Sequence, residues 1–256
     1  MKEPDLEIRT YFVRGKNALV ARADFSELFA AWYLHRLDCV ISLPPAGDAL
    51  GRDALAGIAL HCASRPRNES CAWTVHFAAE KMNLFAAGDN RLGSVVVNVF
   101  TEDVREIAAS VFYADVIEGD LPPRRSVVEF ADTTFLGALE TFYRQSEQRP
   151  ARFFWHGDED LVMISAQPDC DLEWLAALDR EQVLRLDTDV ELALLETRSL
   201  RFECGCNQGR MLDVLAPIFR QQGDELFGDE QTIRIHCPRC GAHHAITREA
   251  LEAHVA

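Results

Sequence analysis

The sequence contains no apolar run close to the ~18–20 residues that a membrane-spanning helix requires. Its first residues, Met1 to Asp5, lead into a charged stretch rather than the apolar core of a signal peptide, so we expect a cytoplasmic protein. Basic residues are few: 26 lysines and arginines stand against 41 aspartates and glutamates, for a formal charge of −15. A general nucleic-acid binder has the opposite balance, so we expect neither nucleic acid nor a membrane as a partner.

The motifs GxSxG, the P-loop and GxGxxG are also absent from the sequence. We therefore expect a protein that is not an enzyme and does not depend on ATP. The 256 residues are 48% hydrophobic and 26% charged, which is the composition of an ordinary globular chain. This length fits one large domain, with or without a small additional module.

Eight cysteines are present, and in a chain that is not exported they are better explained as metal ligands, reactive thiols or small buried hydrophobes than as disulfides. Four are paired, as a CxC that is followed thirty residues later by a CxxC: Cys204, Cys206, Cys237 and Cys240. Close pairs separated by a module-sized loop are typical of a tetrahedral site for one zinc ion, because each pair supplies two thiolates from one tight turn. Gly205 and Gly241 fit such turns, which often need a positive φ.

The other four cysteines are scattered among apolar residues: Cys39, Cys62, Cys71 and Cys170. We interpret each as a small buried hydrophobe that a redox response does not require, because none has a close-spaced partner. Four histidines close to the paired cysteines are interpreted as surface residues, since four thiolates already complete a site: His236, His243, His244 and His254. A thioredoxin-like dithiol at Cys237 and Cys240 is disfavoured, because 241–244 is a poor helix opening and the CxC would stay unexplained.

The order of elements predicts an α+β protein with three parts. These are a large amino-terminal mixed α/β domain over 1–165, a helical linker over 166–203 and a small Cys₄ zinc module over 204–256. Helices are expected at 24–37, 53–62 and 132–148, the last capped by Asp132 or Thr133, and strands at 11–13, 18–20, 111–117, 126–130, 152–155 and 161–165 and within 71–100.

Residues 166–203 are markedly acidic, yet they carry leucine, valine and tryptophan at helical spacing. A segment this short and charged must gain stability from its neighbours. We interpret it as a linker that is helical only while it is docked and that adjoins the zinc module. An ordinary pair of core helices fits the pattern equally well.

The order CxC, thirty residues, CxxC at the carboxyl end resembles the redox-regulated heat shock protein 33 chaperones. Four stretches carry the resemblance: Val13–Gly15 (VRG), Thr134–Phe154 (TFLGALETFYRQSEQRPARFF), Phe202–Cys206 (FECGC) and Ile233–Gly241 with its HC-x-x-CG element. Residues 23–94 match only loosely. The residues after the CxC, 207–209, the short linker and the four additional cysteines depart from the family pattern.

The resemblance implies an ATP-independent holdase that is regulated by oxidation. In the reduced form, one zinc ion per chain is held by Cys204, Cys206, Cys237 and Cys240. Oxidation would release the metal, form the disulfides Cys204–Cys206 and Cys237–Cys240, and expose apolar surface to unfolded or misfolded client proteins. A homodimer is expected in the oxidised form. Two other functions stay open: a thiol–disulfide oxidoreductase that uses Cys237 and Cys240, and a static zinc ribbon joined to an interaction domain.

Overall fold

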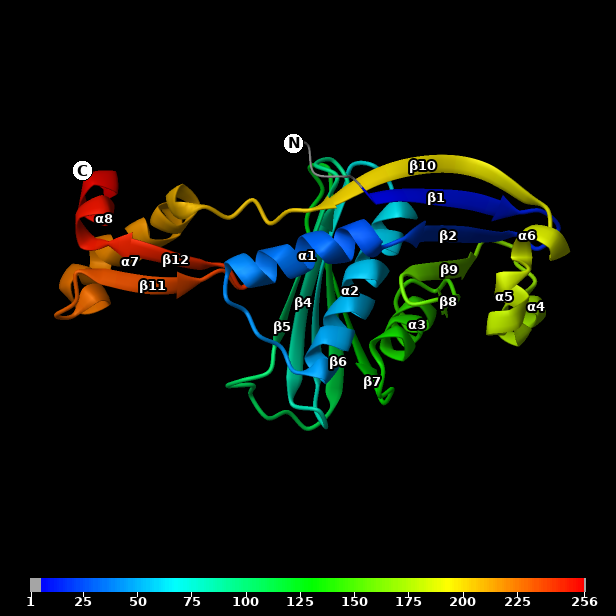
Figure 1. The fold of residues 1–256 in the computed structure, drawn as a ribbon, viewed down its shortest axis with the longest axis horizontal. Helices are drawn as coiled ribbons and strands as arrows, with labels where there is room; N and C mark the ends of the chain where they lie inside the picture. The colour runs from blue at the N-terminus through cyan, green and yellow to red at the C-terminus, as the bar shows by residue number, and fades with distance from the viewer. Residues whose placement is uncertain (1–5, 256) are drawn as a thin grey trace.

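The computed structural model describes residues 6–255 and shows an elongated molecule with a large, strongly twisted sheet in its middle (Figure 1). Ten strands form this sheet in the order β7-β6-β3-β4-β5-β10-β1-β2-β9-β8. Their bounds are β1 (Leu6–Val13), β2 (Ala18–Asp24), β3 (Glu69–Phe77), β4 (Met82–Asp89), β5 (Ser94–Phe100), β6 (Ser110–Glu118), β7 (Arg124–Phe130), β8 (Ala151–His156), β9 (Asp160–Ala166) and β10 (Leu192–Phe202).

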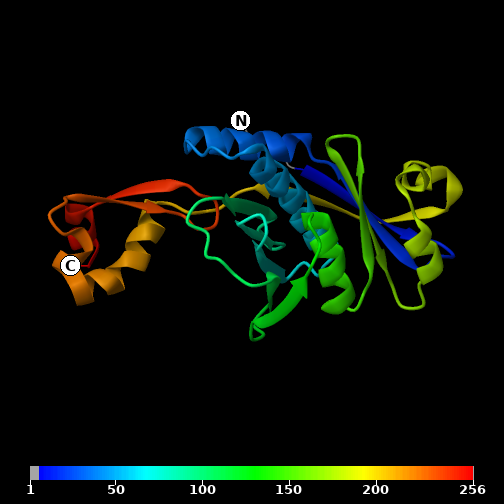
Figure 2. The ribbon, with the colours of Figure 1, turned by 90° about the horizontal axis from the view of Figure 1, so that it is seen from below.

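Three longer helices belong to the body of the molecule: α1 (Ser26–Asp38), α2 (Pro45–Ala63) and α3 (Phe135–Gln145). Three short helices lie at one end of the molecule: α4 (Leu172–Ala177), α5 (Arg180–Leu184) and α6 (Leu186–Asp189). A small module lies at the other end, built from α7 (Gln208–Phe227), the hairpin β11 (Thr232–His236) and β12 (His243–Thr247), and α8 (Arg248–Val255). The two groups stay at opposite ends when the molecule is turned (Figure 2).

Strand β10 joins the two halves of the sheet. It runs antiparallel along the whole of β1. It is parallel to β5 over only two residue pairs, Arg201↔Ser94 and Phe202↔Val95. Within the sheet, the strand pairing between the half that contains β5 and the half that contains β1 therefore depends on the last residues of one strand. Helix α2 also packs on both halves.

The main core lies between the sheet and the helices α1, α2 and α3. Helix α2 is buried along most of its length and packs against β4, β5 and α3. A Cβ at Gly51 would lie 2.4 Å from Cη2 of Trp32, so glycine is what lets α1 pack this closely on α2. Beneath α3, the rings of Phe112 and Phe142 stack with their centroids 4.7 Å apart. Of the hydrophobic clusters in the described part of the chain, the one between the sheet and these helices has the most buried residues.

The predicted α+β class is confirmed, and most of the expected elements are present. β1 and β2 form the expected hairpin, and β3, β4 and β5 fill the stretch that was expected to turn to strands. Helix α3 begins later than predicted, and neither Asp132 nor Thr133 caps it. Thr134 does, because its hydroxyl accepts a hydrogen bond from the amide of Gly137.

The prediction of a helical linker over the whole of 166–203 is wrong for its last third. Helices occur only between Leu172 and Asp189, whereas β10 is a strand. Its alternate residues Leu200 and Phe202 are buried, at 2% and 8% exposure, which is the two-residue period of a strand with one face on the core. The partners that impose this period, β1 and β5, are distant in sequence, so local helical spacing does not reveal them.

Candidate metal centre

The four paired cysteines come together between the end of β10 and the hairpin of the module. Their Sγ atoms all lie within 4.8 Å of one another. The shortest separations join different pairs, with Cys204 Sγ 3.6 Å from Cys237 Sγ and Cys206 Sγ 3.5 Å from Cys240 Sγ. Sulfurs at the corners of a tetrahedron with metal–sulfur bonds of about 2.3 Å lie about 3.8 Å apart, so this spacing fits one ion. The four-cysteine cluster could therefore bind a metal ion.

Two glycines shape the turns that present these sulfurs. Gly205, between the first two cysteines, has φ +66°, and Gly241, directly after the last, has φ +76°. Both values lie in the left-handed region, where other residues are strained. The expectation that these turns need a positive φ is confirmed.

The thiols of the cluster shift one another's protonation. Hydrogen bonding with the Cys240 thiol lowers the pKa of Cys204 to about 5. Burial raises the pKa of Cys206 to about 12, and the hydrogen bond to Cys204 raises the pKa of Cys240. Crowded thiolates repel one another, so a cation is what would hold all of these sulfurs in the charged form.

The cluster packs directly against the body of the molecule. Cys237 and Cys240 are each 2% exposed and belong to the same hydrophobic core as the sheet and α2. At the end of α1, His35 Nε2 donates to the carbonyl of Cys240 over 2.9 Å. On β5, Asn98 Nδ2 donates to the carbonyl of Pro238 over 3.2 Å. The centre thus links the module to α1 and β5 as well as to β10.

Sequence reasoning did not find His35 or Asn98. Neither belongs to a motif, and each lies far along the chain from the cysteine whose turn it contacts. The local sign in the sequence is a histidine within the helix expected at 24–37, and many helices carry one.

The module has a small core of its own. Four residues of it are buried together, at 8% exposure or less: Leu215, Phe227, Ile246 and Leu251. Helix α7 contains Pro217 and a kink at Gln222. So few buried side chains supply little of the free energy that orders about fifty residues.

The neighbouring histidines are mostly where they were expected. His236, His243 and His254 are exposed, and the rings of His236 and His243 stack 4.1 Å apart. His244 is the exception, because it is half-buried with Nε2 3.4 Å from the sulfur of Cys206.

The four scattered cysteines divide into two kinds. Cys62 and Cys71 are buried, as predicted, whereas Cys39 and Cys170 are only half-buried. Cys62 and Cys71 lack a close partner in the sequence but not in space, because their sulfurs are 3.6 Å apart.

The three short helices cover an apolar face at the far end of the sheet. The covered residues come from β1, β2 and β9, and the covering ones from α4 to α6: Val13, Ala18, Val20, Val162 and Ile164 on the sheet, and Leu175, Leu178, Val183 and Leu186 above it. Two ion pairs of 2.8 Å join the β1–β2 hairpin to the helical segment: Lys16–Asp171 and Arg22–Asp187. The helical part of the acidic segment lies away from the module, since the length of β10 separates them, and only the last residues of 166–203 adjoin it (Figure 1).

A family model described as "Hsp33 protein" matches residues 68–247 of this chain. The chain belongs to the Hsp33 family. This confirms the resemblance seen in the motifs. In residues 6–255, no helix of this Hsp33 family member combines the length and the apolar character of a membrane span.

Relatives with the name "33 kDa chaperonin" match part of this Hsp33 chain. The one from Edwardsiella ictaluri is 30% identical over 154 residues, which are 50% of this chain and 53% of that protein. The one from Escherichia coli (strain K12 / DH10B) is 27% identical over 146 residues, or 47% of this chain and 50% of that protein. The chain thus spans about half the length of the curated relatives it matches.

A solved structure extends the likeness to the whole fold. The crystal structure of the 33 kDa chaperonin from Thermotoga maritima superposes with a TM-score of 0.73, covering 98% of this chain and 97% of that one. The two sequences are 14% identical, so the match concerns the fold.

Proposed function

We propose that this chain is a redox-regulated, ATP-independent holdase that binds unfolded or misfolded proteins under oxidative stress in the cytoplasm. The observation that carries the proposal is the cluster of four cysteine sulfurs within 4.8 Å, placed where the module docks on the body. Membership of the Hsp33 family and the name "33 kDa chaperonin" of its relatives support it.

In the reduced form, the residues that would hold one zinc ion are Cys204, Cys206, Cys237 and Cys240. Zinc, when bound, keeps the four sulfurs as thiolates and contributes on the order of 10 kcal/mol or more to folding of the module. The small core around Leu251 makes the module dependent on that contribution.

Oxidation acts on the sulfurs in two equivalent steps. In each, two cysteines give two electrons to one peroxide molecule, whose O–O bond breaks, and with two protons it leaves as two waters while one S–S bond forms. The proposed products are the disulfides Cys204–Cys206 and Cys237–Cys240. The sulfurs then no longer ligate, and the module loses its main source of order.

Loss of the cluster would reach the client-binding face through β10. The cluster starts two residues beyond Phe202, whose pairing with Val95 is the last link between β10 and β5. At the other end of β10, the acidic helices α4 to α6 cover the apolar face. We assign 1–165 to the client-binding body, 166–191 to the releasable cover, β10 to transmission and 204–256 to the redox module. Exposed apolar faces would bind clients and pair two chains, while the charge of −15 keeps the complexes soluble.

The test measures zinc release and suppression of client aggregation in the same samples, before and after peroxide with mild heat. We expect one zinc per reduced chain, its release on oxidation, and suppression of aggregation only afterwards. Cys240→Ser should hold well under one zinc, whereas Cys170→Ser, which removes a thiol at the far end, should hold one. Suppression that peroxide does not change would point to a static zinc ribbon, and turnover of a dithiol substrate to an oxidoreductase.

A further inference from the structure

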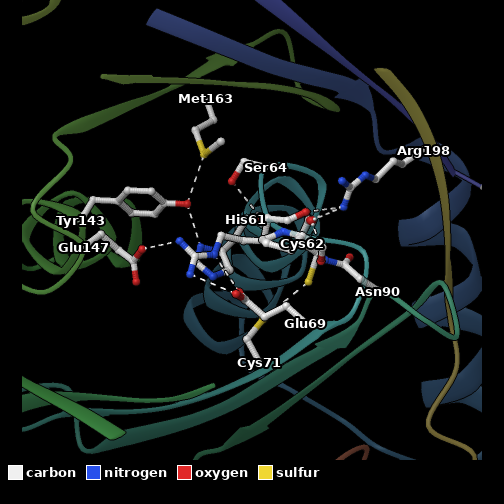
Figure 3. A network of polar contacts seen from close by, with 12 residues as sticks. His61, Cys62, Ser64, Glu69, Cys71, Asn90, Tyr143, Glu147, Met163 and Arg198 are labelled. Atoms are coloured by element: carbon white, nitrogen blue, oxygen red, sulfur yellow. Dashed lines mark hydrogen bonds and ion pairs between the residues drawn. The ribbon is translucent and has the colours of Figure 1, made fainter. Parts of the chain in front are cut away.

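A second pair of thiols, Cys62 and Cys71, lies inside the body of the molecule (Figure 3). Neither belongs to the four-cysteine cluster. Cys62 is next to the last residue of α2, and Cys71 is on β3. Their sulfurs are 3.6 Å apart, and the residues are 1% and 5% exposed. Both side chains therefore face each other in a closed environment.

The packing around the pair leaves space for sulfur. Gly88 lies opposite Cys71 in the register of β3 and β4, and a Cβ at this glycine would lie 2.2 Å from the Cys62 sulfur. Glycine is thus what allows β4 to pass under the thiol. A disulfide needs an S–S distance near 2.05 Å, so the sulfurs must approach by about 1.5 Å, which rotation of the two side chains can supply.

The end of α2 that carries Cys62 is also held from two sides. Asn90, in the turn after β4, donates from Nδ2 to the Cys62 carbonyl over 2.9 Å. Arg198, on β10, donates to the same carbonyl over 3.0 Å and to the carbonyl of Arg65 (Figure 3). The end of α2 that carries Cys62 is therefore fixed in part by β10.

We propose that Cys62 and Cys71 are a second redox site, which forms an intramolecular disulfide when a peroxide reaches it. One sulfur, after losing its proton, attacks the peroxide, the O–O bond breaks and water leaves, so that a sulfenic acid forms. The other sulfur then displaces the sulfenic oxygen, which leaves as a second water while the S–S bond forms. Two thiols lose two electrons in total, and one peroxide gains them.

The site reacts more slowly than the four-cysteine cluster. The hydrogen bond with Cys62, followed by burial, raises the pKa of Cys71, so the thiol stays protonated and weakly nucleophilic. Oxidation requires the corner between α2 and β3 to open, and mild heat raises the population of the open state. The disulfide would close the connection between residues 62 and 71 and fasten α2 to β3.

The experiment treats the reduced full-length protein with hydrogen peroxide at 25 °C and with mild heat, blocks free thiols in denaturant, and digests with trypsin. Cleavage after Arg67 places Cys62 in the peptide 53–67 and Cys71 in the peptide 68–81. We expect these peptides linked, lighter than their sum by two hydrogen atoms. The linked species should form roughly tenfold or more slowly than zinc is released, and faster with heat.

One variant and one native cysteine serve as controls. Cys71→Ala removes the partner, so the peptide 53–67 should then carry the thiol label, and Cys170 should never be found linked to either thiol. The proposal does not depend on the proposed function, because the linked peptides are measured separately from zinc and client binding. It is overturned if both thiols keep the label after heat and peroxide have oxidised the four-cysteine cluster, or if either links to a cysteine of that cluster.

Discussion

At the scale of single residues, the fold buries the carboxyl group of Asp53, and burial disfavours its charged form. It lies on α2, and its Oδ1 accepts a hydrogen bond of 2.9 Å from Nε1 of Trp155 on β8. Burial raises the pKa of Asp53 to about 6 from its ordinary 3.8. The folded state therefore holds this proton more tightly than the unfolded state does.

We predict that Asp53→Asn stabilises the protein at pH 7. A raised folded pKa means that the stability contributed by the protonated carboxyl is fully present below pH 4 and is lost as the pH rises through 6. Asparagine keeps the acceptor for Trp155 and has no proton to lose, so the gain at pH 7 should be roughly 1–3 kcal/mol. Urea unfolding from pH 4 to pH 8 measures it.

Asp158→Asn provides the matched control, since it removes the same charge from an exposed position in the turn between β8 and β9. It should shift stability by less than about 0.5 kcal/mol. Parallel pH profiles for Asp53→Asn and the unaltered protein would contradict the prediction.

The spacing of residues along the sequence predicts some contacts between single residues and misses others. The CxC and CxxC identify their four cysteines because each pair is made by one turn, so sequence distance reflects spatial distance. Cys62 and Cys71 lie on a helix and a strand, and only the packing of α2 on β3 brings their sulfurs together. The contact of His35 with Cys240 likewise depends on where α1 ends relative to the module.

At the scale of elements, helices α4, α5 and α6 have four to six residues each and cannot be stable alone. They stay in place through side chains such as Val183, which is 5% exposed, while its neighbour Leu184 is 43% exposed. The apolar face therefore stays covered only while these side-chain contacts hold the three helices in place.

We predict that Val183→Asp uncovers this face without any oxidant. An unpaired carboxylate under α5 costs several kcal/mol if the helix stays docked, so release of the segment is the favoured result. Hydrogen exchange should show loss of protection over 172–189, and binding of an apolar dye and suppression of client aggregation should rise in the reduced, zinc-loaded protein.

Leu184→Asp places the same charge one residue away on the exposed side and should leave all three measurements near those of the unaltered protein. Equal behaviour of the two variants would contradict the prediction, because it would show that burial of Val183 does not hold the cover.

Elements with their own signals were predicted well. α3 has an apolar stripe and a capping residue next to the expected one, and the β-branched run from Val95 to Phe100 lies in β5. β10 was missed because its leucines fit a helix equally well, and its strand conformation comes from hydrogen bonds with β1 and β5. Tertiary pairing overrode local preference there.

At the scale of the whole molecule, the described part of the chain contains three hydrophobic clusters of unequal size, and one of them lies under α4 to α6. The body has an extended core around α2, whereas the module has a small one around Leu251. In the function proposed above, the module also depends on the cysteine cluster. The body and the module should therefore lose order under different conditions.

We predict that a strong chelator, added under reducing conditions, disorders the module and leaves most of the sheet intact. Hydrogen exchange should show loss of protection over 208–255, with little change in β2 and β9, whose pairing is remote from the cysteines. Cys240→Ser should show the same pattern without chelator. Simultaneous loss of protection in β9 and the module would contradict this prediction.

The position of β10 has a consequence for synthesis of the chain on the ribosome. β1 is made first, but its partner β10 is made only after nearly 180 further residues. At about 5–20 residues per second, this delay is roughly 10–35 s. During that time one edge of β1 has no strand beside it, and one edge of β5 is open as well from the moment β5 has been made. Open edges pair readily with other chains. A member of a chaperone family is thus itself exposed to wrong partners until its tenth strand has been made.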